Sequence, residues 1–172
     1  MMVGKSSLIA AAAATTLIIS ALSSSWADEE YWAAVMRELP EASVSLDQAL
    51  KTSEQEGKPI SAEYDVEDGG FQISVYVEKD GHFREVIVDP KSGTINATKT
   101  LTVPREVDEA QAQSAALSRA KLPLTAALAT AVGSNSGYRA VSIIPMPGDD
   151  EAVAAITLMK GEAIKQVAQK LD

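Results

Sequence analysis

The stretch that decides the fold is residues 60–95, ISAEYDVEDGGFQISVYVEKDGHFREVIVDPKSGTI. Apolar and polar residues alternate through it, and turn sequences interrupt the alternation at 68–70, 79–81 and 89–93. Alternation with period two is typical of strands that bury one face, and short turns that contain Asp-Gly or Pro favour antiparallel hairpins. The pattern predicts strands over 60–66, 71–78 and 86–88, with a last strand over 94–101.

A short amphipathic helix is expected immediately before these strands. Ser45 reads as an N-cap, and Gln48 follows three residues later in the arrangement of a capping box. The helix should end before Gly57, where the period changes from helical to two. The expected core consists of Leu46, Ala49 and Leu50 from the helix and Phe71, Ile73, Val75 and Val77 from the second strand.

The second half of the chain reads as a weaker copy of the first. An alanine-rich helix is expected from Asp108 to Ala120, and beyond Pro123 the residues Leu124, Ala127 and Leu128 repeat the spacing of the first apolar stripe. This correspondence favours an internal duplication. Strand-like segments follow at 138–144 and 151–159, around the polar segment 145–150, and Lys160-Gly161 stands where Asp80-Gly81 stood.

The last segment, residues 162–171, departs from the copy. Ile164, Val167, Ala168 and Leu171 have the spacing of a helix rather than that of a strand. The pattern therefore favours a helix here, but it leaves the choice between helix and strand open.

Residues 86–95, VIVDPKSGTI, resemble the V-x-V-D-x-x-[ST]-G-x-I ending of PepSY domains. The Asp-x-x-Ser-Gly part alone is a good turn, but here it follows a helix and two hairpins in the order of that family. The resemblance implies an α+β fold of two small units, each a helix packed on an antiparallel sheet. The expected parts are a signal peptide at 1–27, a lead-in segment at 28–42, a PepSY domain at 43–101 and a degenerate PepSY-like unit at 102–172.

Residues 1–27 have the three zones of an export signal. Lys5 supplies a positive charge, residues 8–22 are apolar but shorter than the roughly 20 residues of a membrane-spanning helix, and Ser25 and Ala27 are small residues at the positions that a signal peptidase requires. We expect cleavage after Ala27 and a periplasmic or secreted protein with no stable membrane anchor. The alternatives are an uncleaved anchor and a buried alanine-rich helix.

Composition narrows the classes of function. The formal net charge is -9, and removal of residues 1–27 would take away one lysine and no acid. Such a surface repels phosphates, so nucleic acid is not an expected partner, whereas cations or basic protein surfaces are. The chain has no cysteine and a single histidine, His82, which we expect to be a solvated hairpin residue. We predict no catalytic residues and no enzymatic activity.

The candidate site is a row of acids. Glu63, Asp65 and Glu67 should project from one face of one strand, and Glu78, Glu85 and Asp89 should share that face if the hairpins pair as expected. Carboxylates are hard oxygen ligands that suit Ca²⁺ or a lanthanide ion. Residues two apart on a strand lie about 7 Å apart, however, so a solvated acidic face, or a face that binds a partner, is the competing interpretation.

The PepSY resemblance implies a binding module without catalysis that restrains or binds a secreted peptidase or another envelope protein. The sequence therefore predicts an exported, non-enzymatic binding module. The alternative prediction is a periplasmic protein that binds a hard cation, Ca²⁺ or a lanthanide, through Glu63, Asp65 and Glu67; otherwise no cofactor is expected.

Overall fold

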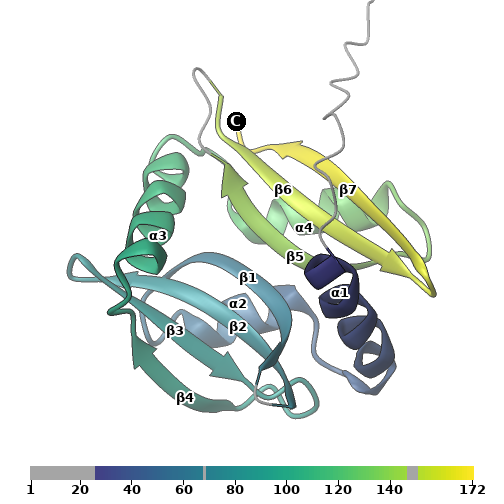
Figure 1. Ribbon diagram of the computed structural model, residues 1–172. Coiled ribbons are helices and arrows are strands. Elements are labelled where there is room, and N and C mark those ends of the chain that lie inside the picture. Colours follow the sequence, from purple (N-terminus) through teal and green to yellow (C-terminus); the bar gives the residue numbers. More distant parts are fainter. Residues whose placement is uncertain (1–25, 68, 147–150) are drawn as a thin grey trace, which may run out of the picture.

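The computed structural model describes residues 26–67, 69–146 and 151–172. Seven strands form one antiparallel sheet with the order β4-β3-β2-β1-β5-β6-β7 (Figure 1). Helices and this sheet together confirm the predicted α+β class. The strands are β1 (Lys58–Glu67), β2 (Gly70–Lys79), β3 (His82–Val88), β4 (Ile95–Thr100), β5 (Arg139–Met146), β6 (Val153–Lys160) and β7 (Ala163–Lys170).

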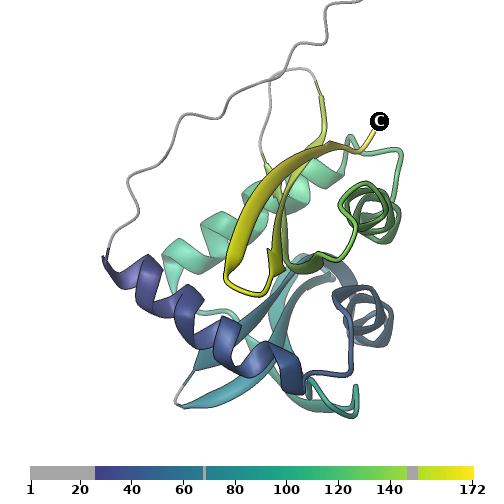
Figure 2. The ribbon, with the colours of Figure 1, turned by 90° about the vertical axis from the view of Figure 1, so that its right-hand side faces the viewer.

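Helices cover both faces of the sheet. Figure 2 shows α2 and α4 on one face, where they contact each other, and α1 and α3 on the opposite face. The molecule therefore has three layers, with the sheet in the middle. The helices are α1 (Trp26–Glu38), α2 (Leu46–Ser53), α3 (Pro104–Leu117) and α4 (Leu124–Gly133), and a short 3-10 helix, η1 (Leu39–Glu41), follows α1.

The helix predicted before the first strand is α2, and it begins as expected. The side chain of Ser45 accepts a hydrogen bond from the N–H of Gln48 at 3.3 Å, and the side chain of Gln48 accepts one from the N–H of Ser45 at 2.8 Å. This reciprocal capping box confirms the start of the helix. The apolar stripe of α2 is buried, as is the row of β2 that it covers, except that Phe71 is only partly buried.

The hairpins of the first half have the predicted register. β1 and β2 pair up to Glu67↔Gly70, and residue 68 of this turn lies outside the described residues. β2 and β3 pair with Tyr76 opposite Glu85. The main-chain register thus places Ile73, Val75 and Val77 on one face and Ser74 and Tyr76 on the other.

The second half repeats the order of one helix followed by strands. Leu124, Ala127 and Leu128 of α4 are buried, as predicted, and β5, β6 and β7 form two antiparallel hairpins. Residues 147–150, between β5 and β6, lie outside the described residues.

The choice between helix and strand that the sequence left open at 162–171 falls to the strand, because Ala163–Lys170 forms β7, against the helical spacing of its apolar residues. β7 is an outermost strand with most of its side chains exposed, so burial does not impose period two on its sequence. Leu171, which completed the apparent helical spacing, is fully buried just beyond the end of the strand.

The two halves share one sheet through β1 and β5. These strands pair antiparallel at Ala62↔Ile143 and Glu63↔Ser142. The boundary predicted between 101 and 102 falls between β4 and α3. β4 is an outermost strand of the sheet, whereas the two halves meet where β1 pairs with β5.

The predicted signal peptide lies almost entirely outside the described residues, which begin at 26. No helix in the described part of the chain is long and apolar enough to cross a membrane.

Candidate functional site

The predicted acidic row does not lie on an open face of the sheet. Glu63 lines a pocket together with residues of α3, and Asp65 interacts with Tyr31 of α1, so both project to the face that carries these helices, and both side chains are partly buried. On this face the hydroxyl of Ser61 donates to the side-chain oxygen of Gln113 in α3 at 2.7 Å. The predicted acidic face is therefore only partly solvated, because α1 and α3, which the strand pattern could not place, lie over part of it.

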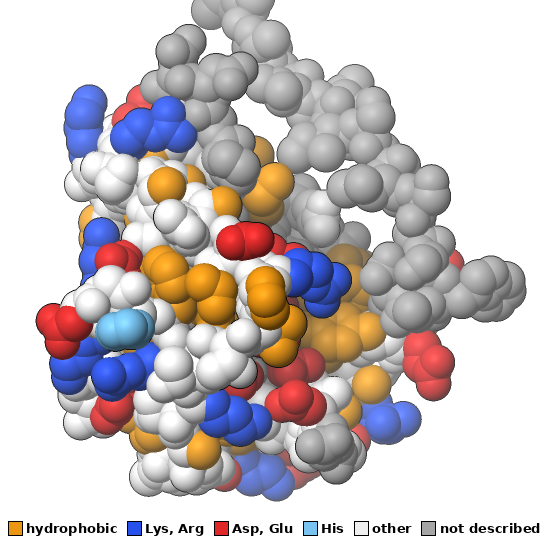
Figure 3. All heavy atoms as spheres, turned by 60° about the vertical axis from the view of Figure 1, so that its left-hand side comes forward, with side chains coloured by type: hydrophobic (Ala, Val, Ile, Leu, Met, Phe, Trp, Pro, Cys, Tyr) orange, Lys and Arg blue, Asp and Glu red, His pale blue; other side chains and the backbone are white. Residues whose placement is uncertain are grey.

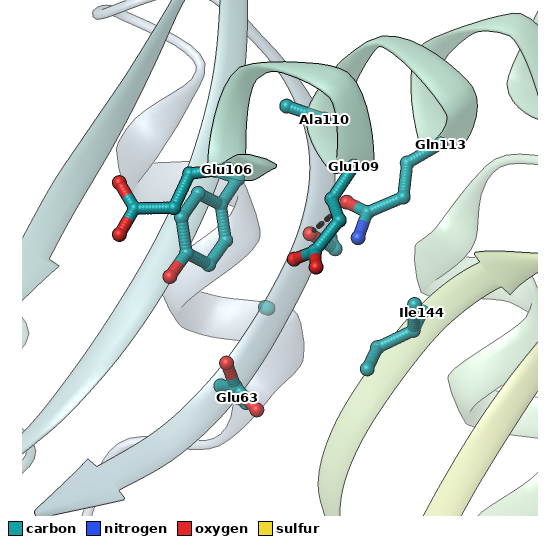
Figure 4. A pocket seen from close by; sticks show the side chains of 9 residues that line it. Glu63, Glu106, Glu109, Ala110, Gln113 and Ile144 are labelled. Atoms are coloured by element: carbon teal, nitrogen blue, oxygen red, sulfur yellow. Dashed lines mark hydrogen bonds between the residues drawn. The ribbon is translucent and has the colours of Figure 1, made fainter. Parts of the chain in front are cut away.

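Glu63 borders a small cavity between the sheet and α3. The cavity has a volume of about 130 Å³, and Tyr76, Glu106, Glu109 and Gln113 also line it. Figure 4 shows Glu109 pointing from α3 toward Glu63, whereas the carboxylate of Glu106 is turned to the side. The cavity thus has a mixed lining, since Ala62, Ala110 and Ile144 also border it, and its volume suits a ligand no larger than a few atoms.

The Glu63 carboxyl resists ionisation. Burial raises its pKa to about 7, and the neighbouring carboxylates of Asp65 and Glu85 add to the increase. Among the described residues Glu63 has no hydrogen bond or ion pair that would stabilise its charged form. The protein therefore holds a carboxyl group here that changes charge near neutral pH.

Burial also raises the pKa values of Asp65 and of the neighbouring Tyr31. Burial raises the pKa of Asp65, while the N–H of Val66, which donates to its Oδ1 at 2.7 Å, acts in the opposite direction. The hydroxyl of Tyr31 in α1 donates to the carbonyl of Tyr64 at 3.0 Å. Burial, followed by the carboxylates of Glu63 and Asp65, raises the pKa of Tyr31.

Glu67 lies in a third environment. Its carboxylate is exposed, and its Oε2 is 3.7 Å from the Nζ of Lys99 in β4. The same Nζ is 3.9 Å from the Oε2 of Glu85, whose Oε1 accepts a hydrogen bond from Ser74 at 2.7 Å. Glu63, Asp65 and Glu67 therefore do not converge on one point. In residues 26–67, 69–146 and 151–172, no group of three or more acids or histidines is arranged to hold a metal ion.

The other acids expected on this face have separate roles. Glu78 accepts a hydrogen bond from the hydroxyl of Ser114 in α3. Asp89 accepts from the N–H of Ser92 at 2.7 Å and from the N–H of Lys91 at 3.0 Å, and these bonds lower its pKa. The carboxylate of Asp89 is therefore engaged within its own turn. The Asp-x-x-Ser-Gly motif is thus a hydrogen-bonded turn.

The surface around His82 mixes both signs of charge. Figure 3 shows basic and acidic side chains interspersed over the face that carries this histidine. His82 is exposed at the first position of β3, opposite Lys79, which confirms the predicted solvated position.

Arg139 is a residue whose role the sequence did not indicate. From the start of β5 its guanidinium donates to the carbonyls of Ala42 and Val44, both at 2.8 Å, and to that of Leu39 at 3.2 Å. It also lies over the ring of Tyr64, 5.0 Å from the centroid. Arg139 therefore fixes the segment between α1 and α2 to the second half of the sheet. A lone arginine in a strand gives no sequence signal for such contacts.

Two further features could bind another molecule. A groove of about 510 Å³ lies beside the contact between α2 and α4 and is lined in part by Leu46, Leu128 and Val132. The sheet also has two outermost strands, β4 and β7, and no strand of the described part of the chain pairs with their outer edges. Unpaired edges present main-chain donors and acceptors in a row.

Comparison of the chain with protein-family models, with curated proteins and with solved structures finds no match. The resemblance to PepSY domains stays a prediction from the sequence.

Proposed function

We propose that this protein is an exported, non-enzymatic binding module that restrains or holds another exported protein, such as a secreted peptidase. The observation that carries the proposal is the pair of unpaired outer strands, β4 and β7, on one continuous sheet. An extended segment of a partner can add to such an edge, with main-chain hydrogen bonds supplying affinity and side chains supplying specificity.

The PepSY resemblance of residues 43–101 supports the same proposal, since that family includes the propeptides of secreted metallopeptidases. The sequence features that led to it are now seen as a capped helix, two hairpins and the turn that Asp89 closes. Fold likeness alone is a weak guide to a partner, so the proposal depends on the edges.

The test measures complex formation and peptidase activity together. The purified protein is added to the exported proteins of its source, complexes are separated by size exclusion, and hydrolysis of casein is followed in the same mixture. We expect a co-migrating exported protein and, where it is a peptidase, slower hydrolysis. A parent protein that forms no complex and leaves hydrolysis unchanged would contradict the proposal.

Hard-cation binding is the second candidate function. The cavity beside Glu63 is a better candidate site for the ion than the open row of Glu63, Asp65 and Glu67 that the sequence predicted. Glu63 and Glu109 point into that cavity from opposite sides, with the Gln113 side chain between the sheet and α3 (Figure 4). Ca²⁺ and lanthanide ions take six to eight oxygen ligands, so water would have to complete the coordination.

Terbium luminescence tests this candidate, because the Tyr76 ring lines the same cavity and would sensitise a bound Tb³⁺. If the cavity binds the ion, Glu63→Gln should weaken binding, whereas Glu67→Gln, at the exposed end of the row, should not. Equal affinity in parent and Glu63→Gln would exclude the cavity.

A further inference from the structure

β7 forms a long and regular edge of the sheet. It pairs with β6 without a bulge from Val153↔Lys170 to Lys160↔Ala163. Residues 163–170, AIKQVAQK, contain neither proline nor glycine, which natural proteins use to interrupt exposed edges. β7 thus retains the geometry that a further strand needs.

The main-chain groups that point outward can be assigned. The N–H of Leu171 donates to the carbonyl of Ala152 at 2.8 Å, toward the β6 side. Because main-chain groups alternate in direction along an antiparallel strand, the odd-numbered residues of β7 bond to β6. Ile164, Gln166 and Ala168 therefore present their N–H and C=O groups outward. Ile164 is 42% exposed and adds an apolar contact beside them.

The charge of β7 is opposite to that of the whole protein. The strand carries Lys165 and Lys170 and no acid, although the chain has a net charge of -9. The Nζ of Lys165 donates to Oδ1 of Asn135 at 2.6 Å, and the Nζ of Lys170 lies 2.6 Å from Oε1 of Glu151. Lysines on edge strands commonly discourage pairing. Here both are held by side chains of the protein itself, and the neutral amide of Asn135 leaves the charge of Lys165 uncancelled.

The opposite edge, β4, is less suited to pairing. It has six residues, and its register with β3 shifts between Ile87 and Val88. The lysine of β4, Lys99, lies between the carboxylates of Glu67 and Glu85. Its charge is therefore already partly neutralised.

We propose that β7 is the docking edge of this protein and that its partner contributes an extended, acidic segment as an eighth strand. This inference rests on the proposed function and adds the edge and the chemistry of the partner. The net negative charge of the protein repels an acidic partner at long range, but at physiological ionic strength charges are screened beyond about 8 Å. Carboxylates of a docked strand would lie closer than that to Lys165, whose charge the neutral Asn135 leaves uncancelled, so this local charge decides; Lys170 is already paired with Glu151.

Two synthetic peptides serve as probes, acetyl-(Val-Glu)₄-amide and acetyl-(Val-Lys)₄-amide. Each is titrated into the ¹⁵N-labelled protein while the amide resonances are followed. We expect the acidic peptide to shift the amides of 164, 166 and 168 most, and to bind about fivefold more tightly than the basic one. Shifts confined to β4, or a basic peptide that binds equally well, would overturn the inference.

A pair of variants tests the edge itself. Ala168→Pro removes an outward N–H without breaking the bonds to β6, and Ala168→Thr keeps that N–H with a residue suited to strands. We expect the first variant to lose binding of the acidic peptide and the second to keep it. Binding that survives in Ala168→Pro would contradict docking at β7.

Charge reversal gives a second test that does not depend on proline. Lys165→Glu should reduce the preference for the acidic peptide and raise affinity for the basic one, each about fivefold. An unchanged preference would exclude the role of this lysine. If Ala168→Pro still binds the exported partner of the parent protein, the edge assignment fails while the proposed function stands; if the parent binds no exported protein, the proposed function fails.

Discussion

The surroundings of Glu63 in the fold determine how readily its carboxyl group ionises. In the sequence it is one of three equivalent acids, whereas in the structure each acid has a different environment. Glu67 is exposed beside Lys99, while Glu63 is covered and faces Asp65 and Glu85. A raised pKa in the folded state means that ionisation of Glu63 opposes folding.

This predicts a pH dependence with a definite sign. The pKa of Glu63 rises from 4.5 to about 7 on folding, so the folded state binds this proton more tightly than the unfolded state does. The favourable contribution is fully present below pH 4.5 and is lost as the pH rises to about 7, with a total change on the order of 3 kcal/mol. Urea denaturation of the parent and of Glu63→Gln between pH 4.5 and 8 measures it.

The difference between the two proteins isolates Glu63 from other titrating groups. Glu63→Gln should gain stability relative to the parent as the pH rises, whereas Glu67→Gln should follow the parent within about 0.5 kcal/mol. A constant difference between parent and Glu63→Gln across this range would show that Glu63 does not titrate as described.

Single contacts also determine how neighbouring elements meet. Gly57, between α2 and β1, passes so close to β2 that a Cβ built there would lie 2.7 Å from the carbonyl oxygen of Glu78. Arg139 holds the segment between α1 and α2 through three main-chain carbonyls. Both contacts join parts of the chain that are distant in sequence.

We expect Gly57→Ala to destabilise the protein by about 1–3 kcal/mol, because main chain cannot move aside as a flexible side chain can. Gly133→Ala is the matched control, since a Cβ at that helical position meets nothing within 4 Å. It should be neutral or slightly stabilising. Thermal or urea denaturation of both variants checks the contrast, and an equal effect would refute the steric argument.

Arg139→Lys should cost about 2–4 kcal/mol, because an ammonium group cannot reach all the carbonyls that the guanidinium serves. Hydrogen exchange should increase most for residues 42–46, whose segment loses its attachment. Arg37→Lys, at a side chain that is 72% exposed, should change stability by less than about 0.5 kcal/mol. Unaltered exchange at 42–46 would mean that other contacts hold the segment.

At the scale of the whole molecule, the two halves are parts of one packed structure. β1 pairs with β5, α2 contacts α4, and buried residues of both halves belong to one hydrophobic core. Arg139 and Tyr64 add a contact between the halves. Such shared burial couples the unfolding of one half to that of the other.

We therefore expect a single cooperative thermal transition, with calorimetric and van't Hoff enthalpies that agree. Scanning calorimetry with circular dichroism checks this, because both signals should give the same midpoint. Two resolved transitions would show that the seam between β1 and β5 contributes little, and that the halves unfold as separate domains.

Local patterns in the sequence were sufficient for several features of this protein. Period-two alternation predicted β1 and β2 with their buried faces, the Ser45 and Gln48 pattern predicted the start of α2, and repeated spacing predicted α4. These features depend on residues that are neighbours in the chain, or on one side of one element being buried. The α+β class followed from them.

Only the tertiary structure decided what lies over the acidic residues and at the edges. A strand pattern shows that Glu63 and Asp65 share a face, but α1 and α3 come from distant segments, and their docking makes that face partly buried. The role of Arg139 depends on carbonyls about 100 residues earlier in the chain. β7 reads as a helix because an exposed edge strand is shaped mainly by its main-chain bonds to β6, which do not depend on side-chain identity.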